Sequence, residues 1–311
     1  MTQEIMQVSP LPPFMMNALQ EADYIVHDHA HIKDPGALGK VTALIGTGAA
    51  KVDKKLLSMM PNLKLIAICG VGYDGVDVAA AIEKGVVVTH TPGVLSDDVA
   101  DLTMGLVLSI GRRLPQADKF VRNGDWTDDV FPLTHKVSGA RLGIVGMGRI
   151  GRAIAKRASA FDMHIAYASR APKADLPYRF YDDVAALAAE VDYLVVAVPG
   201  GDDTHHLIDS EVLLALGQKG YLINISRGSV VDQPVLVQAL KDKTIAGAAL
   251  DVFWDEPIVD PELRRLSNVV LTPHIASATV ETRHAMAALT MQNLQAFYEK
   301  AVLPTPVPEC Q

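Results

Sequence analysis

The stretch LGIVGMGRIGRAIA, Leu142–Ala155, decides the fold. An apolar strand pattern runs directly into a turn that contains Gly146, Gly148 and Gly151, and a helical pattern follows. In such a unit the first glycine permits a tight turn, the second lets a pyrophosphate approach the backbone, and the third lets the helix pack on the strand. The free N–H groups at the helix start then bind the phosphates. GxGxxG alone is weak evidence, but in this context it predicts a dinucleotide-binding turn rather than a plain βα turn.

Short apolar runs alternate with helical patterns on both sides of this turn. This alternation predicts parallel sheets covered by helices, an α/β fold class with two Rossmann-like or flavodoxin-like sheets. A long apolar helix from Ser96 separates the two series, and a final helix is predicted over about Val280–Lys300. The predicted strands of the first series are Tyr24–Val26, Ala43–Ile45, Leu65–Cys69 and Val86–Thr89. Those of the second are Leu142–Val145, His164–Ala168, Tyr193–Val198, Tyr221–Ile225, Ala246–Leu250 and Val269–Leu271, which make a complete doubly wound sheet.

Bulk composition narrows the class of protein. At 311 residues the chain has room for about two domains. Its net charge of −8 and the lack of a long basic stretch argue against a nucleic-acid partner. No signal peptide and no membrane span are expected, and the two cysteines, Cys69 and Cys310, fit a reducing cytoplasm rather than a disulfide framework. No metal site is predicted.

The end of the second Rossmann strand bears on the choice of cofactor. An NAD site usually carries an acidic residue there, which accepts the ribose hydroxyls. This sequence offers Ser169, Arg170 and Lys173 instead. A hydroxyl and two cations suit a 2′-phosphate, so NADP(H) is favoured over NAD(H). A solvated surface turn is the simpler alternative.

Three further strand ends of the second sheet carry unusual polar residues. They are Arg227, Glu256 in the loop DVFWDEP, and His274. Ligands of open α/β sheets bind beyond the carboxyl ends of the strands, so these side chains could meet at one rim. Each also has a structural interpretation, because Arg227 could bridge to Asp232, Glu256 could be a solvated loop residue, and His274 could cap a turn.

Together the three groups suit the reduction of a 2-oxo acid. Hydride transfer to a ketone carbon leaves negative charge on its oxygen, and an imidazole is a suitable proton donor near neutral pH. A carboxylate beside the imidazole favours its protonated form and fixes the ring. A guanidinium holds the oxo-acid oxygens and stabilises the developing charge.

The ordered motifs GMGRIG, NISRGSVVD, GAALDVFWDEP and LTPHIAS, preceded by GVGYDGVD and HTPGVLSDDVADL, resemble the D-2-hydroxyacid dehydrogenase family. Within the family the chain looks most like glyoxylate/hydroxypyruvate reductases and plant-type hydroxyphenylpyruvate reductases. The resemblance covers about Val41 to Tyr298. It implies a cytoplasmic enzyme that reduces glyoxylate and hydroxypyruvate with NADPH. Phenylpyruvate-type substrates, phosphoglycerate dehydrogenase activity and a dinucleotide-sensing scaffold remain alternatives.

The resemblance also implies a role for individual residues. Catalysis would rest on Arg227, Glu256 and His274, and the N–H groups of Val71 and Gly72 would hold the substrate carboxylate. A substrate domain would comprise residues 1–110 and 291–311, and a cofactor domain residues 111–290. Cofactor contacts would come from Gly146, Gly148, Arg149, Ile150, Gly151, Ser169, Arg170, Lys173, Val198, Pro199, Thr204, Ile225, Ser226, Asp251 and Ala276.

Two departures from the family pattern are present. Val198-Pro199-Gly200-Gly201-Asp202 replaces a common Pro-Leu-Thr stretch, and Ala276 replaces a common glycine. Family members are usually homodimers joined through the cofactor domains, near the loop Trp126–Phe131 of this chain. Trp126 or Phe131 could reach toward the partner's active site, or these rings could pack locally.

Overall fold

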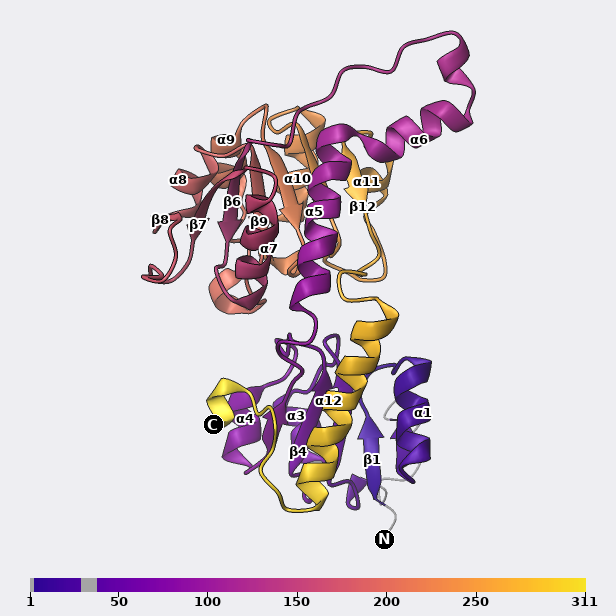
Figure 1. Cartoon of the computed structure of the whole chain (residues 1–311). Coiled ribbons are helices and arrows are strands. Elements are labelled where there is room, and N and C mark those ends of the chain that lie inside the picture. Colours follow the sequence, from indigo (N-terminus) through magenta and orange to yellow (C-terminus); the bar gives the residue numbers. More distant parts are fainter. Residues whose placement is uncertain (1–2, 29–37) are drawn as a thin grey trace. The chain divides into compact units, whose positions relative to one another are not determined.

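The computed structural model describes residues 3–28 and 38–311, which form two compact units (Figure 1). The first unit comprises Met1–Leu95 and Thr279–Gln311, and the second comprises Ser96–Ala278. Each unit contains its own parallel sheet, as the alternation of strand and helix patterns predicted. The fold class is therefore confirmed.

The sheet of the first unit has five strands in the order β2-β1-β3-β4-β5, which is the flavodoxin-like order. Helices α1 and α12 pack together and contact β2 and β4, whereas α3 and α4 form a second pair. The strands are β1 Glu4–Gln7, β2 Ile25–Asp28, β3 Ala43–Thr47, β4 Leu65–Cys69 and β5 Val87–Thr89. The helices are α1 Pro13–Glu21, α3 Lys54–Ser58, α4 Val78–Glu83, α12 Val280–Tyr298 and the 3-10 turn η5 Pro308–Cys310.

The sheet of the second unit has seven strands in the order β12-β11-β10-β9-β6-β7-β8, the doubly wound order with one strand added. The strands are β6 Arg141–Val145, β7 His164–Ala168, β8 Arg179–Tyr181, β9 Tyr193–Val196, β10 Tyr221–Asn224, β11 Gly247–Leu250 and β12 Val269–Leu271. The α-helices are α5 Ser96–Arg112, α6 Leu114–Arg122, α7 Arg149–Ser159, α8 Val184–Ala188, α9 Ser210–Leu216, α10 Gln233–Lys241 and α11 Pro261–Arg265. The 3-10 turns are η2 Asp125–Thr127, η3 Asp202–Thr204 and η4 Gly228–Val230.

Two strands escaped the sequence analysis. β1 is only four residues long, yet it lies between β2 and β3. β8 is a three-residue strand at the edge of the second sheet. Their sequences, EIMQ and RFY, mix polar and apolar residues, whereas the similarly short β5 and β12 are mostly apolar runs, so β1 and β8 show no strand pattern of their own.

The boundaries of the two units differ from those expected at residues 110 and 290. All of α5 belongs to the second unit, because it packs on α7 and on the strands β10, β11 and β12. Arg157 of α7 strengthens this packing through ion pairs with Asp97 and Asp101 of α5. All of α12 belongs to the first unit, where it packs on β4 and α1. Periodicity shows that a helix has an apolar face, but not which sheet covers that face.

Aspartate side chains fix where several helices begin. The carboxylates of Asp53, Asp77, Asp183 and Asp209 accept hydrogen bonds from backbone N–H groups in the first turn of the helix that each precedes. Asp232 does the same for α10. Such caps satisfy N–H groups that have no partner within the helix. Within the described residues, no helix has both the length and the apolar character needed to span a bilayer.

Candidate active site

The glycine turn after β6 has the geometry that a bound pyrophosphate needs. Gly146 has φ +100°, and a Cβ there would lie 2.5 Å from the carbonyl oxygen of Ala197. A Cβ at Gly151 would lie 2.1 Å from the carbonyl oxygen of Gly146, so this glycine lets α7 approach the turn. Around Gly148 no atom lies within 4 Å of the Cβ position. Gly146 and Gly151 therefore have the structural roles predicted for them, and the pyrophosphate contact at Gly148 stays a prediction.

The start of α7 leaves N–H groups for a ligand. The N–H of Arg152 bonds to the carbonyl of Gly148 at 3.0 Å, and the preceding N–H groups are those that a helix start leaves without a partner in the helix. The side chain of Arg149 is exposed and that of Ile150 is half-buried. This turn fits the pyrophosphate of a dinucleotide.

Cationic and hydroxyl groups follow β7. The Ser169 hydroxyl donates to the carbonyl of Ala171 at 2.7 Å, and the N–H of Lys173 donates to the Tyr167 hydroxyl at 2.7 Å. Arg170 is exposed and has no ion pair with another residue that the structure describes. This segment is thus shaped by local hydrogen bonds, and the Arg170 side chain is exposed.

One acidic residue near this segment was missed by the sequence analysis. Asp175 forms a two-pronged ion pair with Arg152, with distances of 2.6 and 3.1 Å between nitrogen and oxygen atoms. The Arg152 guanidinium holds the pKa of Asp175 below its ordinary value, a direction that Lys173 supports. Asp175 is therefore paired with the first turn of α7.

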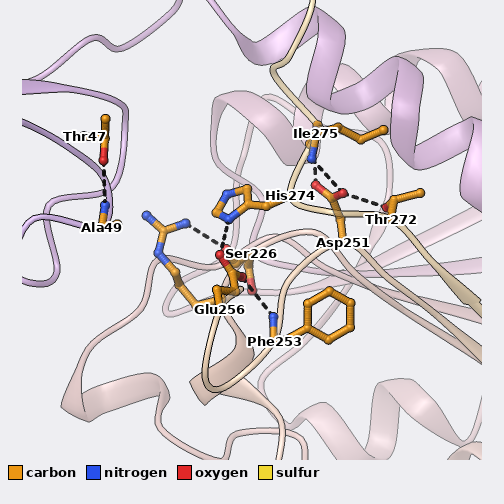
Figure 2. Close-up of polar contacts among 11 residues, drawn as sticks. Thr47, Ala49, Ser226, Asp251, Phe253, Glu256, Thr272, His274 and Ile275 are labelled. Carbon is orange, nitrogen blue, oxygen red and sulfur yellow. Dashed lines mark hydrogen bonds and ion pairs between the residues drawn. The ribbon is translucent and has the colours of Figure 1, made fainter. Parts of the chain in front are cut away.

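His274 and Glu256 meet at the carboxyl ends of β12 and β11. Figure 2 shows the two side chains pointing toward one another, with Nδ1 of His274 2.6 Å from Oε2 of Glu256. The other oxygen of Glu256 accepts the N–H of Phe253 at 2.9 Å, which fixes the carboxylate. Nδ1 of the imidazole is thus engaged by Glu256, and the sequence-based interpretations of Glu256 as a solvated loop residue and of His274 as a cap do not describe this pair.

The charge state of Glu256 follows from its surroundings. Burial raises its pKa, but the hydrogen bond and charge of His274, the N–H of Phe253 and the charge of Arg227 together outweigh burial. The pKa of Glu256 therefore lies below its ordinary value. The carboxylate remains charged at neutral pH beside the imidazole.

Asp251 shapes the loop that presents His274. Its side chain is fully buried, with 0 % exposure. One carboxylate oxygen accepts the Thr272 hydroxyl at 2.6 Å and the N–H of Ile275 at 2.9 Å, and the other accepts the N–H of Ala276 at 2.9 Å (Figure 2). The resemblance placed Asp251 among cofactor contacts, whereas these bonds show in addition that it organises the loop after β12.

Asn224 organises the loop that carries Arg227, as Asp251 does for the loop that carries His274. Its amide oxygen accepts both the N–H and the hydroxyl of Ser226 at 3.0 Å, and its amide nitrogen donates to the carbonyl of Arg227 at 2.9 Å. The Arg227 guanidinium donates to the carbonyl of Ser226 at 2.8 Å. Asp232, the suggested partner of Arg227, contacts His206 at 3.5 Å and caps α10. Asn224 and Thr272 were missed because their importance depends on which loop they face.

The remaining predicted cofactor residues lie around the same strand ends. The Thr204 hydroxyl donates to the carbonyls of Pro199 at 2.7 Å and Gly201 at 3.2 Å, so the glycine-containing loop is closed by its own hydrogen bonds. Val198 is half-buried beside the turn, since one of its methyl groups lies 2.9 Å from the Cβ position of Gly146. Ile225, Ser226 and Ala276 are buried. Contact of these residues with a dinucleotide stays a prediction.

The predicted substrate loop lies in the first unit, directly after β4. The carbonyl of Val71 is held by Nδ1 of the buried His90 at 3.0 Å. Within the described residues of that unit, the N–H groups of Val71 and Gly72 have no acceptor. Both cysteines are free, and the described residues contain no group of His, Cys, Asp and Glu arranged for a metal.

Comparison with known proteins places this geometry in a family. Residues 104–276 match the model of the D-isomer specific 2-hydroxyacid dehydrogenase NAD-binding domain. The chain is 49 % identical over 267 residues to glyoxylate/hydroxypyruvate reductase A HPR2 of Arabidopsis thaliana, which covers 86 % of this chain and 85 % of the relative. It has the same identity and coverage with hydroxyphenylpyruvate reductase of Plectranthus scutellarioides.

A solved structure extends the likeness to the whole chain. The NADPH-dependent glyoxylate/hydroxypyruvate reductase of Sinorhizobium meliloti, in complex with NADP and malonate, is 40 % identical with a TM-score of 0.94, covering 100 % of this chain and 98 % of that one. The family resemblance seen in the motifs is thereby confirmed. The chain belongs to the D-isomer specific 2-hydroxyacid dehydrogenase family of NAD(P)-dependent oxidoreductases.

Proposed function

We propose that this protein reduces small 2-oxo acids, glyoxylate to glycolate and hydroxypyruvate to D-glycerate, with NADPH. The observation that carries the proposal is the 2.6 Å contact of His274 with Glu256, whose pKa the charge of Arg227 helps to lower. When bound, the nicotinamide supplies the hydride. His274 donates the proton to the substrate oxygen, Glu256 keeps the imidazole oriented, and Arg227 binds the oxygens of the oxo acid.

The substrate carboxylate is proposed to bind the N–H groups of Val71 and Gly72. Support comes from their lack of an acceptor within the described residues of the first unit, and from the contact between His90 and the Val71 carbonyl. A loop that presents adjacent N–H groups provides donors for an anion without adding a charged side chain. This arrangement suits the carboxylate of any 2-oxo acid, so the side chain of the substrate is recognised by other residues.

The preference for NADPH rests on the segment after β7. Ser169, Arg170 and Lys173 provide a hydroxyl and two cations, and Asp175 is engaged by Arg152. A 2′-phosphate beside Arg170 would gain charge-assisted hydrogen bonds that a ribose hydroxyl does not offer.

Aromatic substrates are a second candidate. The hydroxyphenylpyruvate reductase of Plectranthus scutellarioides is as similar to this chain as the glyoxylate/hydroxypyruvate reductase of Arabidopsis thaliana. Pocket selectivity for side chains that differ by a few carbon atoms rests on small free-energy differences. The two substrate classes therefore have to be separated by measurement.

A homodimer is also proposed. Helix α6 and the segment that follows it in the sequence extend away from the sheet of their own unit (Figure 1). The side chains of Trp126, Val130 and Leu133 are 70, 83 and 101 % exposed. Phe131, in contrast, packs edge-on against Phe120 with ring centroids 5.4 Å apart. Trp126 is thus the aromatic residue that is left to contact a second copy, since exposed apolar patches mark interaction sites.

A substrate panel tests the proposal. Purified protein is mixed with glyoxylate, hydroxypyruvate or phenylpyruvate, each with NADPH and with NADH, and nicotinamide absorbance is followed. We expect the highest kcat/KM with NADPH and glyoxylate or hydroxypyruvate. A preference for phenylpyruvate would select the second candidate. Dinucleotide binding without turnover of any 2-oxo acid would instead identify a sensing scaffold.

A further inference from the structure

The loops that carry Arg227 and Glu256 contact each other through their backbones. A Cβ at Gly228 would lie 2.1 Å from the carbonyl carbon of Phe253 and 2.5 Å from the nitrogen of Trp254, so a larger residue does not fit. Gly228 follows Arg227 directly, and Trp254 lies two residues before Glu256. A shift of either loop would therefore be passed to the other.

The side chain of Trp254 joins these two loops. Its indole N–H donates to the carbonyl of Val231 at 2.8 Å, just after the η4 turn that follows Arg227. Its backbone N–H lies 3.5 Å from the amide oxygen of Gln233. Trp254 is 38 % exposed, so it is not simply a core side chain. Its position is explained by the bonds that it makes between the Arg227 loop and the Glu256 loop.

His206 covers one face of the indole. The rings of His206 and Trp254 are parallel, with an interplanar angle of 1° and centroids 5.2 Å apart, which is an offset stack. His205 stacks on His206 in turn, with centroids 3.8 Å apart. Nδ1 of His206 lies 3.5 Å from the carboxylate of Asp232. The indole thus lies between a hydrogen bond at its edge and a ring on its face.

The backbone of His206 is held by the η4 turn that follows Arg227. His206 has φ +52°, a left-handed conformation that is uncommon outside glycine. Its N–H bonds to the carbonyl of Ser229 at 2.9 Å, and the N–H of Ile208 bonds to the carbonyl of Val230 at 3.0 Å. Such a conformation persists only where the surroundings hold it, and it occurs often at functional sites.

We propose that Trp254, supported by His206, is a positioning residue that fixes the Arg227 loop against the Glu256 loop. This inference rests on the proposed reduction, in which a guanidinium and an imidazole act on one carbonyl group. Small displacements of such groups lower the rate strongly, although no bond to the substrate is lost. Trp254 and His206 therefore act through Glu256, His274 and Arg227 rather than on the reactants.

Two variants of Trp254 separate its hydrogen bond from its ring. Trp254→Phe keeps a ring against His206 but removes the N–H, whereas Trp254→Leu removes both. With glyoxylate and NADPH we expect kcat to fall about 3-fold for the phenylalanine variant and about 30-fold for the leucine variant. The Kd of NADPH should stay within about 2-fold of wild type. Leu214→Ala, at a 71 % exposed position on α9 of the same unit, is the matched control.

A variant of His206 tests its stacked ring. His206→Asn tolerates the left-handed backbone but removes the ring. We expect about a 5-fold lower kcat for this variant. Wild-type kcat in both Trp254→Leu and His206→Asn would overturn the proposal. Equal losses of kcat and NADPH affinity would also overturn it, because they indicate a general structural role.

A fluorescence measurement tests the stack without turnover. The chain has two tryptophans, so Trp126→Phe leaves Trp254 as the sole source of tryptophan fluorescence. Adding His206→Asn should expose the indole face and shift its emission to longer wavelength. An unchanged emission spectrum would mean that the rings are not stacked, which would overturn the proposal. If the wild-type protein reduced no 2-oxo acid, the proposed function would fail while this measurement still decided the stack.

Discussion

The backbone N–H of His274 donates to the backbone carbonyl of Asp251 at 2.9 Å, which ties the imidazole-bearing loop to the end of β11. His274 has φ +53°, so this loop depends on its hydrogen bonds to hold an uncommon backbone conformation. The side chain of Asp251 supplies three further bonds to Thr272, Ile275 and Ala276. The proposed proton donor is therefore positioned by the strand next to its own, the same strand whose loop carries Glu256.

Replacing Asp251 should cost both stability and rate. Asp251→Asn leaves one oxygen to accept three donors and places an amide NH₂ against an N–H group. We expect a loss of about 1–3 kcal/mol in the free energy of unfolding, measured by urea titration, because buried donors lose their acceptor. We also expect kcat to fall about 10-fold as the loop moves. Asp182→Asn, an exposed change between β8 and α8 of the same unit, is the control, and equal effects of the two variants would contradict the assignment.

Loss of the His274 imidazole should remove most turnover but leave cofactor binding intact. His274→Asn is preferred over alanine, because asparagine tolerates the left-handed backbone. We expect kcat for glyoxylate to fall by about 100-fold or more, as for loss of a general acid. The Kd of NADPH, measured by nicotinamide fluorescence, should change little. The exposed His164 gives the control variant His164→Asn, and near wild-type turnover in His274→Asn would exclude the proposed role.

The lowered pKa of Glu256 predicts how stability depends on pH. A carboxylate with a lowered folded-state pKa contributes stability that is fully present above the unfolded value, about 4.3 for glutamate, and is lost as the pH falls through the lower folded value. Urea unfolding from pH 7 to pH 3 should therefore show a smaller acid loss in Glu256→Gln than in wild type. Because the side chain is one-third exposed, we expect a modest difference, and identical curves would refute it.

The choice between NADPH and NADH is tested at Arg170. Arg170→Ala should raise the Kd of NADPH about 10-fold, because the guanidinium no longer pairs with the 2′-phosphate. The Kd of NADH should change by less than about 2-fold. Arg179→Ala removes an arginine that lies over Tyr181 on the neighbouring edge strand, so it serves as the control for charge alone. Equal weakening of both cofactors by Arg170→Ala would contradict the proposed preference.

The exposed apolar residues that follow α6 in the sequence predict a dimer contact. Trp126→Ala combined with Leu133→Ala should shift the protein from dimer to monomer at micromolar concentration, because both side chains lie on the exposed segment. Sedimentation velocity measures the change. Leu214→Ala, equally exposed but on α9, should leave the assembly unchanged. A wild-type protein that sediments as a monomer would disprove the contact.

Local sequence determined the elements that carry the strongest patterns. Gly146 and Gly151 were predicted from their spacing between a strand pattern and a helical pattern, because a positive φ and a close helix approach exclude other residues there. The long strands and α5 were likewise visible from periodicity. Arg227, Glu256 and His274 were identified because parallel strands end at one rim of the sheet.

Only the tertiary structure decided what supports these residues. The bonds from Asp251 to the loop after β12, and the stack of His206 on Trp254, join segments that lie far apart in the sequence. The unit to which α5 and α12 each belong likewise depended on which sheet buries the apolar face of the helix. Spacing in a sequence reports backbone geometry over a few residues, whereas the partner of a buried polar group is set by packing between distant segments.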